Sequence, residues 1–342
     1  MKNLLKWQQQ LVPDLLAQMK VRYSILQSIR LNEPVGRRLL AQMLDMTERV
    51  LRSEVDFLKS HQLIEYQTAG MGLTNSGREL LLGLEDYMRE TSGLYETEEQ
   101  LGGVLGISKT IIVSGDSDKI PLIKDEIGKA CASILEGLLE KKNIITVTGG
   151  TTMNSVAEAL EHIDVSGKEI LFIPARGGVG GKVIHQANSI AETMAENTGS
   201  GNRALYMPDV VSDELRSILL KEPSINATLD IICSADIVLH GIGEALKMAE
   251  RRNTVEKDMD TLIKGKAVGE AFGYYFDDEG SIVHKVSTIG LQLEDLPAIK
   301  HIIAVAGGKS KAKAIRAYMK NAPPTSILIT DEGAAIEILK GE

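Results

Sequence analysis

The sequence predicts an α/β protein of two domains, a small and mainly helical N-terminal domain and a larger domain built on a doubly wound, mostly parallel sheet. A chain of 342 residues is long enough for two domains. From Ile107 onward, a short apolar run, a loop with glycine or other small residues and an amphipathic helix recur in turn. The first 90 residues instead show helical periodicity followed by one hairpin-like segment.

Composition excludes several classes of protein. No apolar run reaches about 18 residues, so the sequence predicts no membrane span. The first residues carry Gln and Asp where a secretory leader needs an apolar core, so we expect a cytoplasmic protein. The two cysteines, Cys131 and Cys233, are expected to be reduced and buried. Neither they nor the six histidines show metal-ligand spacing, so no metal site is predicted.

Charge is divided unevenly along the chain. Residues 1–90 carry 12 basic and 11 acidic side chains, a balance of +1, whereas the remaining residues carry 26 and 36, a balance of −10. The first 90 residues therefore form a separate electrostatic unit. An acidic body does not prevent a locally basic surface from docking on phosphates.

Residues 21–87 predict short helices followed by a small hairpin. Pro34 lies near the start of one helix, "EPVGRRLLAQML", and Thr47 is the expected N-cap of the next, "DMTERVLRSEVDFLKSHQL". Only Asp45 and Met46 separate the two, which is the length of the turn in a helix-turn-helix. "LIEYQTAGMGLTNSGREL" then predicts strand, turn, strand and helix, the order of a winged helix-turn-helix. Four residues are expected to form the buried stripe of the second helix: Val50, Leu51, Val55 and Leu58.

The start of that second helix is where recognition helices contact bases and phosphates. A solvated helix face would explain any single arginine there, but the ordered set of helices, tight turn, wing and arginines favours DNA binding. Two arginines at the head of the preceding helix are placed to hold the DNA backbone. The predicted DNA-binding residues are Arg37, Arg38, Thr47, Arg49, Arg52 and Ser53.

The boundary between the domains is predicted from a polar, acidic segment with two glycines, "EDYMRETSGLYETEEQLG". We expect a DNA-binding domain over residues 1–90, a linker over 91–105 and a ligand-binding domain over 106–342.

Six apolar runs predict the strands of the larger domain. They lie in "TIIVSGD", "NIITVTGG", "EILFIPARGG", "ADIVLHGIGEA", "IIAVAGGKSKAKAI" and "TSILITDEGAAIEIL". Ligands of such sheets bind at the carboxyl ends of the strands, where the glycine-containing loops all fall. The loops are therefore expected to converge on one crevice.

Two of these loops have the composition of anion sites. In "GGTT", Gly149 and Gly150 allow close backbone approach, and Thr151 and Thr152 add hydroxyl donors at a helix N-terminus. "AGGKSKAKAI" repeats this arrangement with Lys311 near the start of its helix. A tight turn without a ligand would explain one Gly-Gly pair. It explains less well five strand ends that each contain glycine and have Thr, Lys or Arg nearby.

Further charged residues complete the candidate site. Arg251 and Arg252 lie together near a helix end, and Glu270 supplies a carboxylate that could hold sugar hydroxyls or act as a base. Two anion loops with added guanidinium groups suit a ligand with two phosphates. Nucleotide binding is disfavoured because neither GxxxxGK[ST] nor a GxGxxG after a strand occurs. The residues 277–279 of "FDDEGSIV" are expected in a solvated hairpin turn.

These segments together resemble the SorC/DeoR-type bacterial sugar-responsive transcription regulators. The motifs that carry the resemblance include "EPVGRRLLAQMLDMTERVLRSEVDFLK", "VTGGTT", "PARGG", "HGIGEA", "RRNT" and "EAFGYYF", and they extend over essentially the whole chain. The resemblance implies a repressor with a winged helix-turn-helix and an effector domain similar to sugar-phosphate isomerases and glucosamine-6-phosphate deaminases. Members most similar to this chain respond to fructose 1,6-bisphosphate and control glycolytic genes.

The resemblance also implies the effector contacts. It adds Arg176 of "PARGG" and Gln186 of "IHQAN" to the residues already found. The resulting set is Gly149, Gly150, Thr151, Thr152, Arg176, Gln186, Arg251, Arg252, Glu270 and Lys311.

One alternative belongs to another class, an active sugar-phosphate isomerase or deaminase with a DNA-binding head. Such an enzyme needs a base and an acid beside the sugar carbonyl, and Glu270 alone does not make that pair. We therefore predict binding without turnover, no catalytic residues and no cofactor. Operator DNA and a phosphorylated sugar are the expected partners, and paired half-sites favour a homodimer or homotetramer.

Overall fold

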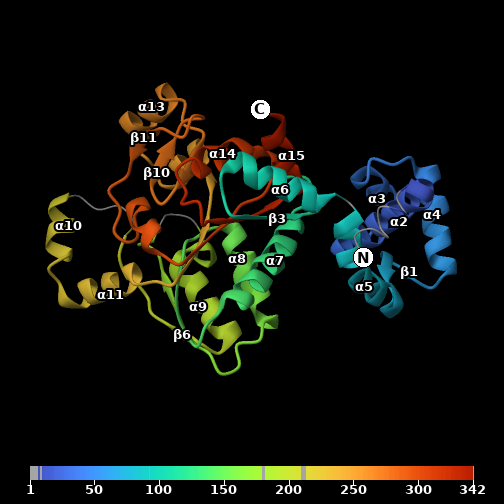
Figure 1. Cartoon of the computed structure of the whole chain (residues 1–342), viewed down its shortest axis with the longest axis horizontal. Coiled ribbons are helices and arrows are strands. Elements are labelled where there is room, and N and C mark those ends of the chain that lie inside the picture. The colour runs from blue at the N-terminus through green and yellow to red at the C-terminus, as the bar shows by residue number, and fades with distance from the viewer. Residues whose placement is uncertain (1–6, 8–9, 92, 179–181, 209–212, 342) are drawn as a thin grey trace. The chain divides into compact units, whose positions relative to one another are not determined.

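The computed structural model describes residues 7, 10–91, 93–178, 182–208 and 213–341. Contacts between residues divide the chain into two units, Met1–Thr97 and Glu98–Glu342. Figure 1 shows the helices and strands of each unit.

The N-terminal unit is a winged helix-turn-helix, as predicted. Its elements are α2 (Pro13–Asn32), α3 (Arg37–Met43), α4 (Glu48–Ser60), β1 (Ile64–Gln67), β2 (Gly70–Leu73) and α5 (Asn75–Thr91). The turn between α3 and α4 passes through Asp45, whose φ of 52° is left-handed. Thr47 caps α4, because its hydroxyl accepts a hydrogen bond from the Val50 N–H at 3.4 Å.

One residue of the predicted stripe of α4 is not buried. Leu51, Val55 and Leu58 are buried in the unit's core, but Val50 is 51% exposed. The buried residues follow the helical spacing of four and three, and Val50 lies about 100° away from Leu51 around the axis. The prediction for Val50 was therefore wrong.

The residues expected as a linker lie mainly in a helix, α6 (Leu94–Leu105), and the division between the units falls within it. Glu98 of this helix is buried and reaches the outer strand β3 (Lys109–Val113) of the main sheet. Its carboxylate accepts the Ile112 N–H at 2.7 Å, and its carbonyl oxygen accepts the Thr110 hydroxyl at 2.5 Å. The side of β3 away from the sheet is thus bonded to α6.

The second unit is built on a seven-stranded sheet with the strand order β3-β13-β12-β7-β4-β5-β6, and its strand pairs are parallel. The six predicted runs are confirmed as strands: β3, β4 (Lys142–Val147), β5 (Glu169–Pro174), β7 (Ile237–Gly241), β12 (His301–Val305) and β13 (Ile327–Asp331). The two-residue edge strand β6 (Gly201–Asn202) was not predicted.

The direction in which strands are added reverses between β4 and β7. The chain proceeds from β4 outward through β5 and β6, and then returns to place β7 on the other side of β4. Such a switch point leaves a crevice at the carboxyl ends of the two strands.

Helices and short turns connect the strands of this unit. They are α7 (Ile123–Leu138), α8 (Thr151–Ala159), η1 (Leu160–His162), η2 (Val183–His185), α9 (Ala187–Thr198), α10 (Asp213–Leu219), α11 (Pro223–Cys233), α12 (Ala245–Arg251), α13 (Glu256–Lys264), η3 (Leu293–Ala298), η4 (Lys309–Lys311), α14 (Ala312–Met319) and α15 (Glu332–Lys340). Cys131 in α7 is buried as expected, whereas Cys233 at the end of α11 is exposed, which corrects that prediction.

A second, four-stranded antiparallel sheet has the order β11-β10-β9-β8. Its strands are β8 (Gly243–Glu244), β9 (Gly269–Ala271), β10 (Tyr274–Phe276) and β11 (Ile282–Lys285). The predicted hairpin turn after β10 is confirmed, because the Asp277 N–H donates to the Ser281 carbonyl and the Gly280 N–H to the Asp277 carbonyl, both at 3.0 Å.

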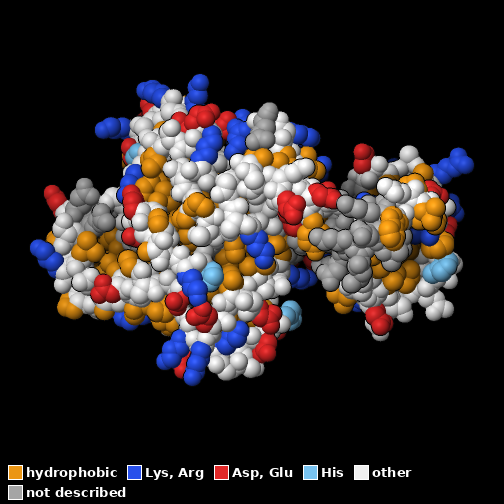
Figure 2. Space-filling view, viewed as in Figure 1, with side chains coloured by type: hydrophobic (Ala, Val, Ile, Leu, Met, Phe, Trp, Pro, Cys, Tyr) orange, Lys and Arg blue, Asp and Glu red, His pale blue; other side chains and the backbone are white. Residues whose placement is uncertain are grey.

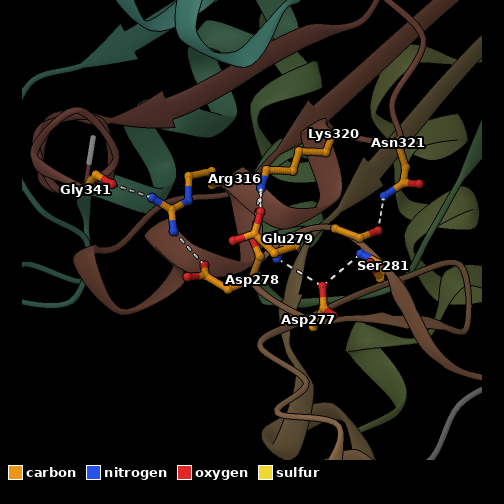
Figure 3. Close-up of polar contacts among 9 residues, drawn as sticks. Asp277, Asp278, Glu279, Ser281, Arg316, Lys320, Asn321 and Gly341 are labelled. Carbon is orange, nitrogen blue, oxygen red and sulfur yellow. Dashed lines mark hydrogen bonds and ion pairs between the residues drawn. The ribbon is translucent and has the colours of Figure 1, made fainter.

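The tip of this hairpin forms ion pairs with residues of α14 and its C-cap, so the turn expected to be solvated is partly bonded to the protein (Figure 3). Arg316 donates to the Asp278 carboxylate at 2.7 Å and to the carbonyl of Gly341 at 2.8 Å. Lys320 contacts Glu279 at 3.0 Å. At the same end of the sheet, where Gly269 pairs with Phe276, a Cβ on Gly269 would lie 2.9 Å from the Cα of Ala314, so only glycine allows β9 to pack this closely on α14.

Surface charge in the second unit is mixed. Figure 2 shows Lys and Arg side chains beside Asp and Glu side chains over much of its visible face. None of the helices that the structure describes is long and apolar enough to cross a membrane.

Candidate functional site

The loop after β4 lies at the switch point of the main sheet. Thr148 ties it to the neighbouring strand β7, because the Gly241 N–H donates to the Thr148 hydroxyl at 3.1 Å. Gly149 is required here, since an added Cβ would lie 2.6 Å from the His185 carbonyl oxygen. Gly150 has a φ of 136° and donates its N–H to the same oxygen at 3.0 Å. Both glycines therefore serve the approach of this loop to the backbone of residue 185, and the anion contact expected of them stays a prediction.

Helix α8 begins directly after these glycines and has no side-chain cap. Thr151 at its first position is exposed, and Thr152 is 5% exposed. An uncapped helix start with two adjacent hydroxyls supplies donors to an anion, and the helix dipole favours negative charge there.

A buried carboxylate, Glu270 in the middle of β9, organises a group of arginines. It accepts hydrogen bonds from Arg252 at 2.9 Å and from the Gly273 N–H at 2.7 Å, and Arg176 lies 3.6 Å away. The three charged side chains are all at most 7% exposed. Arg252 also donates to the Tyr275 hydroxyl at 2.9 Å. The structure thus brings together three residues that are 18 to 94 positions apart in the sequence.

The charge state of this group follows from its contacts. Burial acts to raise the pKa of Glu270, but Arg252, Arg176 and the Gly273 N–H outweigh it, and the pKa is lowered. The carboxylate is therefore ionised at neutral pH. Burial lowers the pKa of Arg251, and the nearby Arg252 lowers it further, as expected for cations held close together.

Arg251 connects the arginines to the "GGTT" loop. Its guanidinium approaches the His185 carbonyl oxygen at 3.5 Å, and that oxygen also accepts the Gly150 N–H. Gln186 follows His185 at the N-cap of α9, and its Oε1 lies 3.5 Å from where a Cβ on Gly178 would be. Gln186 therefore lies beside the "PARGG" loop that carries Arg176. Residues 179–181 of that loop lie outside the described residues.

The loop after β12 differs from the expectation of an open anion site. Its three consecutive N–H groups already donate to carboxylates: Gly308 to Asp331 at 2.7 Å, Lys309 to Asp116 at 3.3 Å and Ser310 to Asp118 at 2.6 Å. Lys311 follows in η4, where burial lowers its pKa, and Lys124 adds to the effect.

A basic residue near both loops, Lys124, was missed by the sequence reasoning. Lys124 lies in the first turn of α7 and acts on the pKa of both His185 and Lys311, so the two loops lie in one electrostatic neighbourhood. The pKa of His185 is lowered by burial first, and then by Arg251, Lys182 and Lys124. A lysine in the first turn of a helix, where the dipole disfavours a cation, was a signal that could have revealed Lys124.

The predicted DNA-binding residues lie at the starts of two helices. Arg37 and Arg38 open α3, and Arg49 and Arg52 lie in the first two turns of α4; all four are exposed. Thr47 and Ser53 are exposed as well.

Two of these arginines share a neighbourhood with the wing. Burial raises the pKa of Tyr66 in β1, whereas Arg37 and Arg52 both act to lower it, so all three lie close together. The Lys59 ammonium lies 4.7 Å from the centre of the Tyr66 ring. The sequence reasoning missed Lys59 and Tyr66 because the pairing depends on how the wing folds back.

Comparisons with known proteins agree with this arrangement. Residues 89–340 match the family model described as "Putative sugar-binding domain", and residues 18–88 match the model of the CggR N-terminal DNA binding domain. The central glycolytic genes regulator of Priestia megaterium is 52% identical over 341 residues, covering 99% of both chains. That of Bacillus subtilis is 48% identical over 342 residues, covering 100% of both.

The chain belongs to the SorC/DeoR family of sugar-binding transcriptional regulators. The relatives that match over the full length are named as gene regulators, which agrees with the prediction of binding without turnover.

Solved structures support the same assignment. A "putative SorC family transcriptional regulator" from Enterococcus faecalis is 48% identical, with a TM-score of 0.68 over 71% of this chain and 99% of that one. The full-length sorbitol operon regulator SorC of Klebsiella pneumoniae is 17% identical and covers 89% of this chain and 94% of its own, with a TM-score of 0.64. The latter shows the fold alone.

Proposed function

We propose that this chain is a repressor of glycolytic genes whose operator binding is relieved by a sugar with two phosphates, fructose 1,6-bisphosphate. The observation that carries the proposal is the buried Glu270–Arg252–Arg176 group, whose neighbour Arg251 shares the His185 carbonyl oxygen with the Gly150 N–H at the uncapped start of α8. The relatives that share about half of the residues over the full length are named as central glycolytic genes regulators.

The α8 end of the crevice is suited to one phosphate. The backbone N–H groups at the helix start and the hydroxyls of Thr151 and Thr152 supply donors, as in other helix N-terminal anion sites. Arg176 supplies a planar guanidinium, which suits phosphate oxygens. Glu270 holds that guanidinium in place through the 3.6 Å contact.

The second phosphate is proposed to lie toward Arg251 and Lys311. Both groups have a pKa lowered by burial and by nearby cations, and an added anion would relieve this repulsion. Gln186 is proposed to hold a sugar hydroxyl or a phosphate oxygen from the intervening loop. A ligand with one phosphate would leave one of the two ends without its anion.

The N-terminal unit is proposed to read DNA through α4, with Arg49, Arg52, Thr47 and Ser53 toward the major groove and with Arg37 and Arg38 on phosphates. Two copies are needed to read paired half-sites, so we propose a homodimer or homotetramer acting in the cytoplasm. Residues 1–90 would form the DNA-binding domain and residues 106–342 the effector domain, joined through 91–105.

The proposal is tested by titrating sugar phosphates into a complex of the full chain with operator DNA. Fluorescence anisotropy should show release at much lower concentrations of fructose 1,6-bisphosphate than of fructose 6-phosphate. Losing one desolvated phosphate removes several charge-assisted hydrogen bonds of about 1.5–3 kcal/mol each. Equal potency of the two sugars would contradict the two-phosphate site.

A further inference from the structure

The two oxygens of the buried Glu270 carboxylate have different surroundings. Oε1 accepts the Gly273 N–H at 2.7 Å and an N–H of Arg252 at 2.9 Å, and Arg176 approaches the same atom at 3.6 Å. Oε2 accepts no hydrogen bond from the part of the chain that the structure describes. Each oxygen of a carboxylate is an acceptor, so one side of this group is left for a donor from outside the chain.

This second oxygen faces the loop after β7. Gly243 of that loop is paired with Glu270 in the register of β8 and β9, and a Cβ added to it would lie 3.8 Å from Oε2. In the main sheet, β7 lies between β12 and β4, so its loop lies between the two loops at which the phosphates are proposed to bind. The part of a bisphosphate that lies there is the sugar, whose hydroxyls are donors for a carboxylate oxygen.

Arg252 holds the first oxygen in a fixed position. Its side chain is 3% exposed, and its guanidinium donates to two acceptors, Oε1 of Glu270 and the Tyr275 hydroxyl, each at 2.9 Å. Tyr275 is fully buried and pairs with Glu270 in the register of β9 and β10. A planar guanidinium with two fixed acceptors has a defined orientation, and it defines that of the carboxylate in turn.

We infer that Arg252 and Tyr275 are positioning residues, which together hold Oε1 of Glu270 so that Oε2 is presented to a hydroxyl of the effector sugar. The inference rests on the proposed function and adds how the sugar between the two phosphates is recognised. It also gives two neighbouring arginines different roles. Arg251 contacts a phosphate, whereas Arg252 acts through Glu270, in place of the direct ligand contact expected from the sequence.

The experiment is calorimetry on the full chain with two ligands, fructose 1,6-bisphosphate and pentane-1,5-diyl bisphosphate, which carries no hydroxyl. The affinity for the sugar divided by that for the alkane reports the hydroxyl contact, because effects on the phosphates cancel in this ratio. Arg252→Lys keeps the charge but loses the rigid fork that bonds Glu270 and Tyr275. The ratio should fall about tenfold, as for the loss of one hydrogen bond to a charged group. Tyr275→Phe keeps the ring and should lower it about threefold.

Two further variants that conserve charge are the controls. Arg251→Lys changes a proposed phosphate contact, so it should weaken both ligands by the same factor and leave the ratio unchanged. Arg316→Lys alters the support of the same small sheet at its hairpin tip, where Arg316 donates to Asp278 at 2.7 Å, and it should also leave the ratio unchanged. Melting curves show which variants are folded at the temperature of the titration, and Tyr275→Phe decides the question if Arg252→Lys is not.

The inference is wrong if the ratio in the folded Arg252→Lys variant equals that of the wild type, because Glu270 then needs no support from Arg252. A fall of the same size in Arg316→Lys also overturns it, since this shows a general loosening of the sheet. Equal affinity of the wild type for the two ligands shows that no hydroxyl is recognised. These three results leave the proposed function intact, whereas binding of neither ligand to the wild type removes both.

Discussion

Replacing Glu270 by glutamine should destabilise the sugar-binding domain strongly. The carboxylate is 4% exposed, accepts hydrogen bonds from Arg252 and the Gly273 N–H, and lies 3.6 Å from Arg176. Glutamine keeps the volume but removes the charge, so two guanidinium groups that are at most 7% exposed lose an ionic partner. Breaking a buried ion pair by removing one partner costs about 3–5 kcal/mol.

The loss can be measured by thermal unfolding of the full chain, followed through the transition of the larger domain. For a domain of this size, each kcal/mol lowers the melting temperature by about 2–4 °C, so a decrease of roughly 6–20 °C is expected. Glu169→Gln is the matched control, because Glu169 pairs with Lys142 at 3.0 Å while both side chains are more than two-thirds exposed. That exposed pair should contribute at most about 1 kcal/mol. A Glu270→Gln protein as stable as the control would refute the reasoning.

Three further predictions concern DNA, signalling and pH. Replacing Arg49 or Arg52 by alanine should weaken operator binding by about 1–3 kcal/mol if the residue reads a base, or lower the salt slope by about one if it holds a phosphate; unchanged binding in both folded variants would exclude α4 as the reader. Thr152→Val should bind the operator normally yet need more sugar phosphate for release, and loss of operator binding without ligand would show a purely structural role. Burial lowers the pKa of His240 to about 4, whereas the unfolded chain takes up this proton below about 6.5. The free energy of unfolding should therefore decrease by about 2 kcal/mol as the pH is lowered from 7 to 5. Denaturant titrations of His240→Gln should not show this decrease, and a variant with the same pH dependence as the wild type would contradict the prediction.

Much of the fold could be predicted because its signals are local. The run from Ile144 to Val147 before Gly149 predicts a buried strand and a break wherever the rest of the chain lies. Thr47 was identified as a cap for the same reason, since its partner Val50 is only three residues away. The exposure of Val50 itself depends on which face of α4 meets the core, and that is set by tertiary packing.

The contacts of the site could be predicted only in part. The residue types around Glu270 were found, but the pairing of one carboxylate with Arg252 and Arg176 depends on how the second sheet packs against the loop after β5. The hydrogen bond from the Ser310 N–H to the Asp118 carboxylate could not be predicted, because 192 positions separate the two residues and sequence periodicity carries no information over that distance. Hydrogen bonds of this range follow from topology and not from local pattern.

The bonding of Glu98 to β3 has a consequence for how the larger domain behaves when it is produced alone. A strand at the border of a sheet offers its free N–H and C=O groups to any other chain, and proteins cover such borders to avoid aggregation. Here the covering is supplied by α6, through the Ile112 N–H and the Thr110 hydroxyl. A fragment that begins at residue 106 would leave this border open and should self-associate through β3, whereas one that begins before Leu94 should remain dispersed in light scattering.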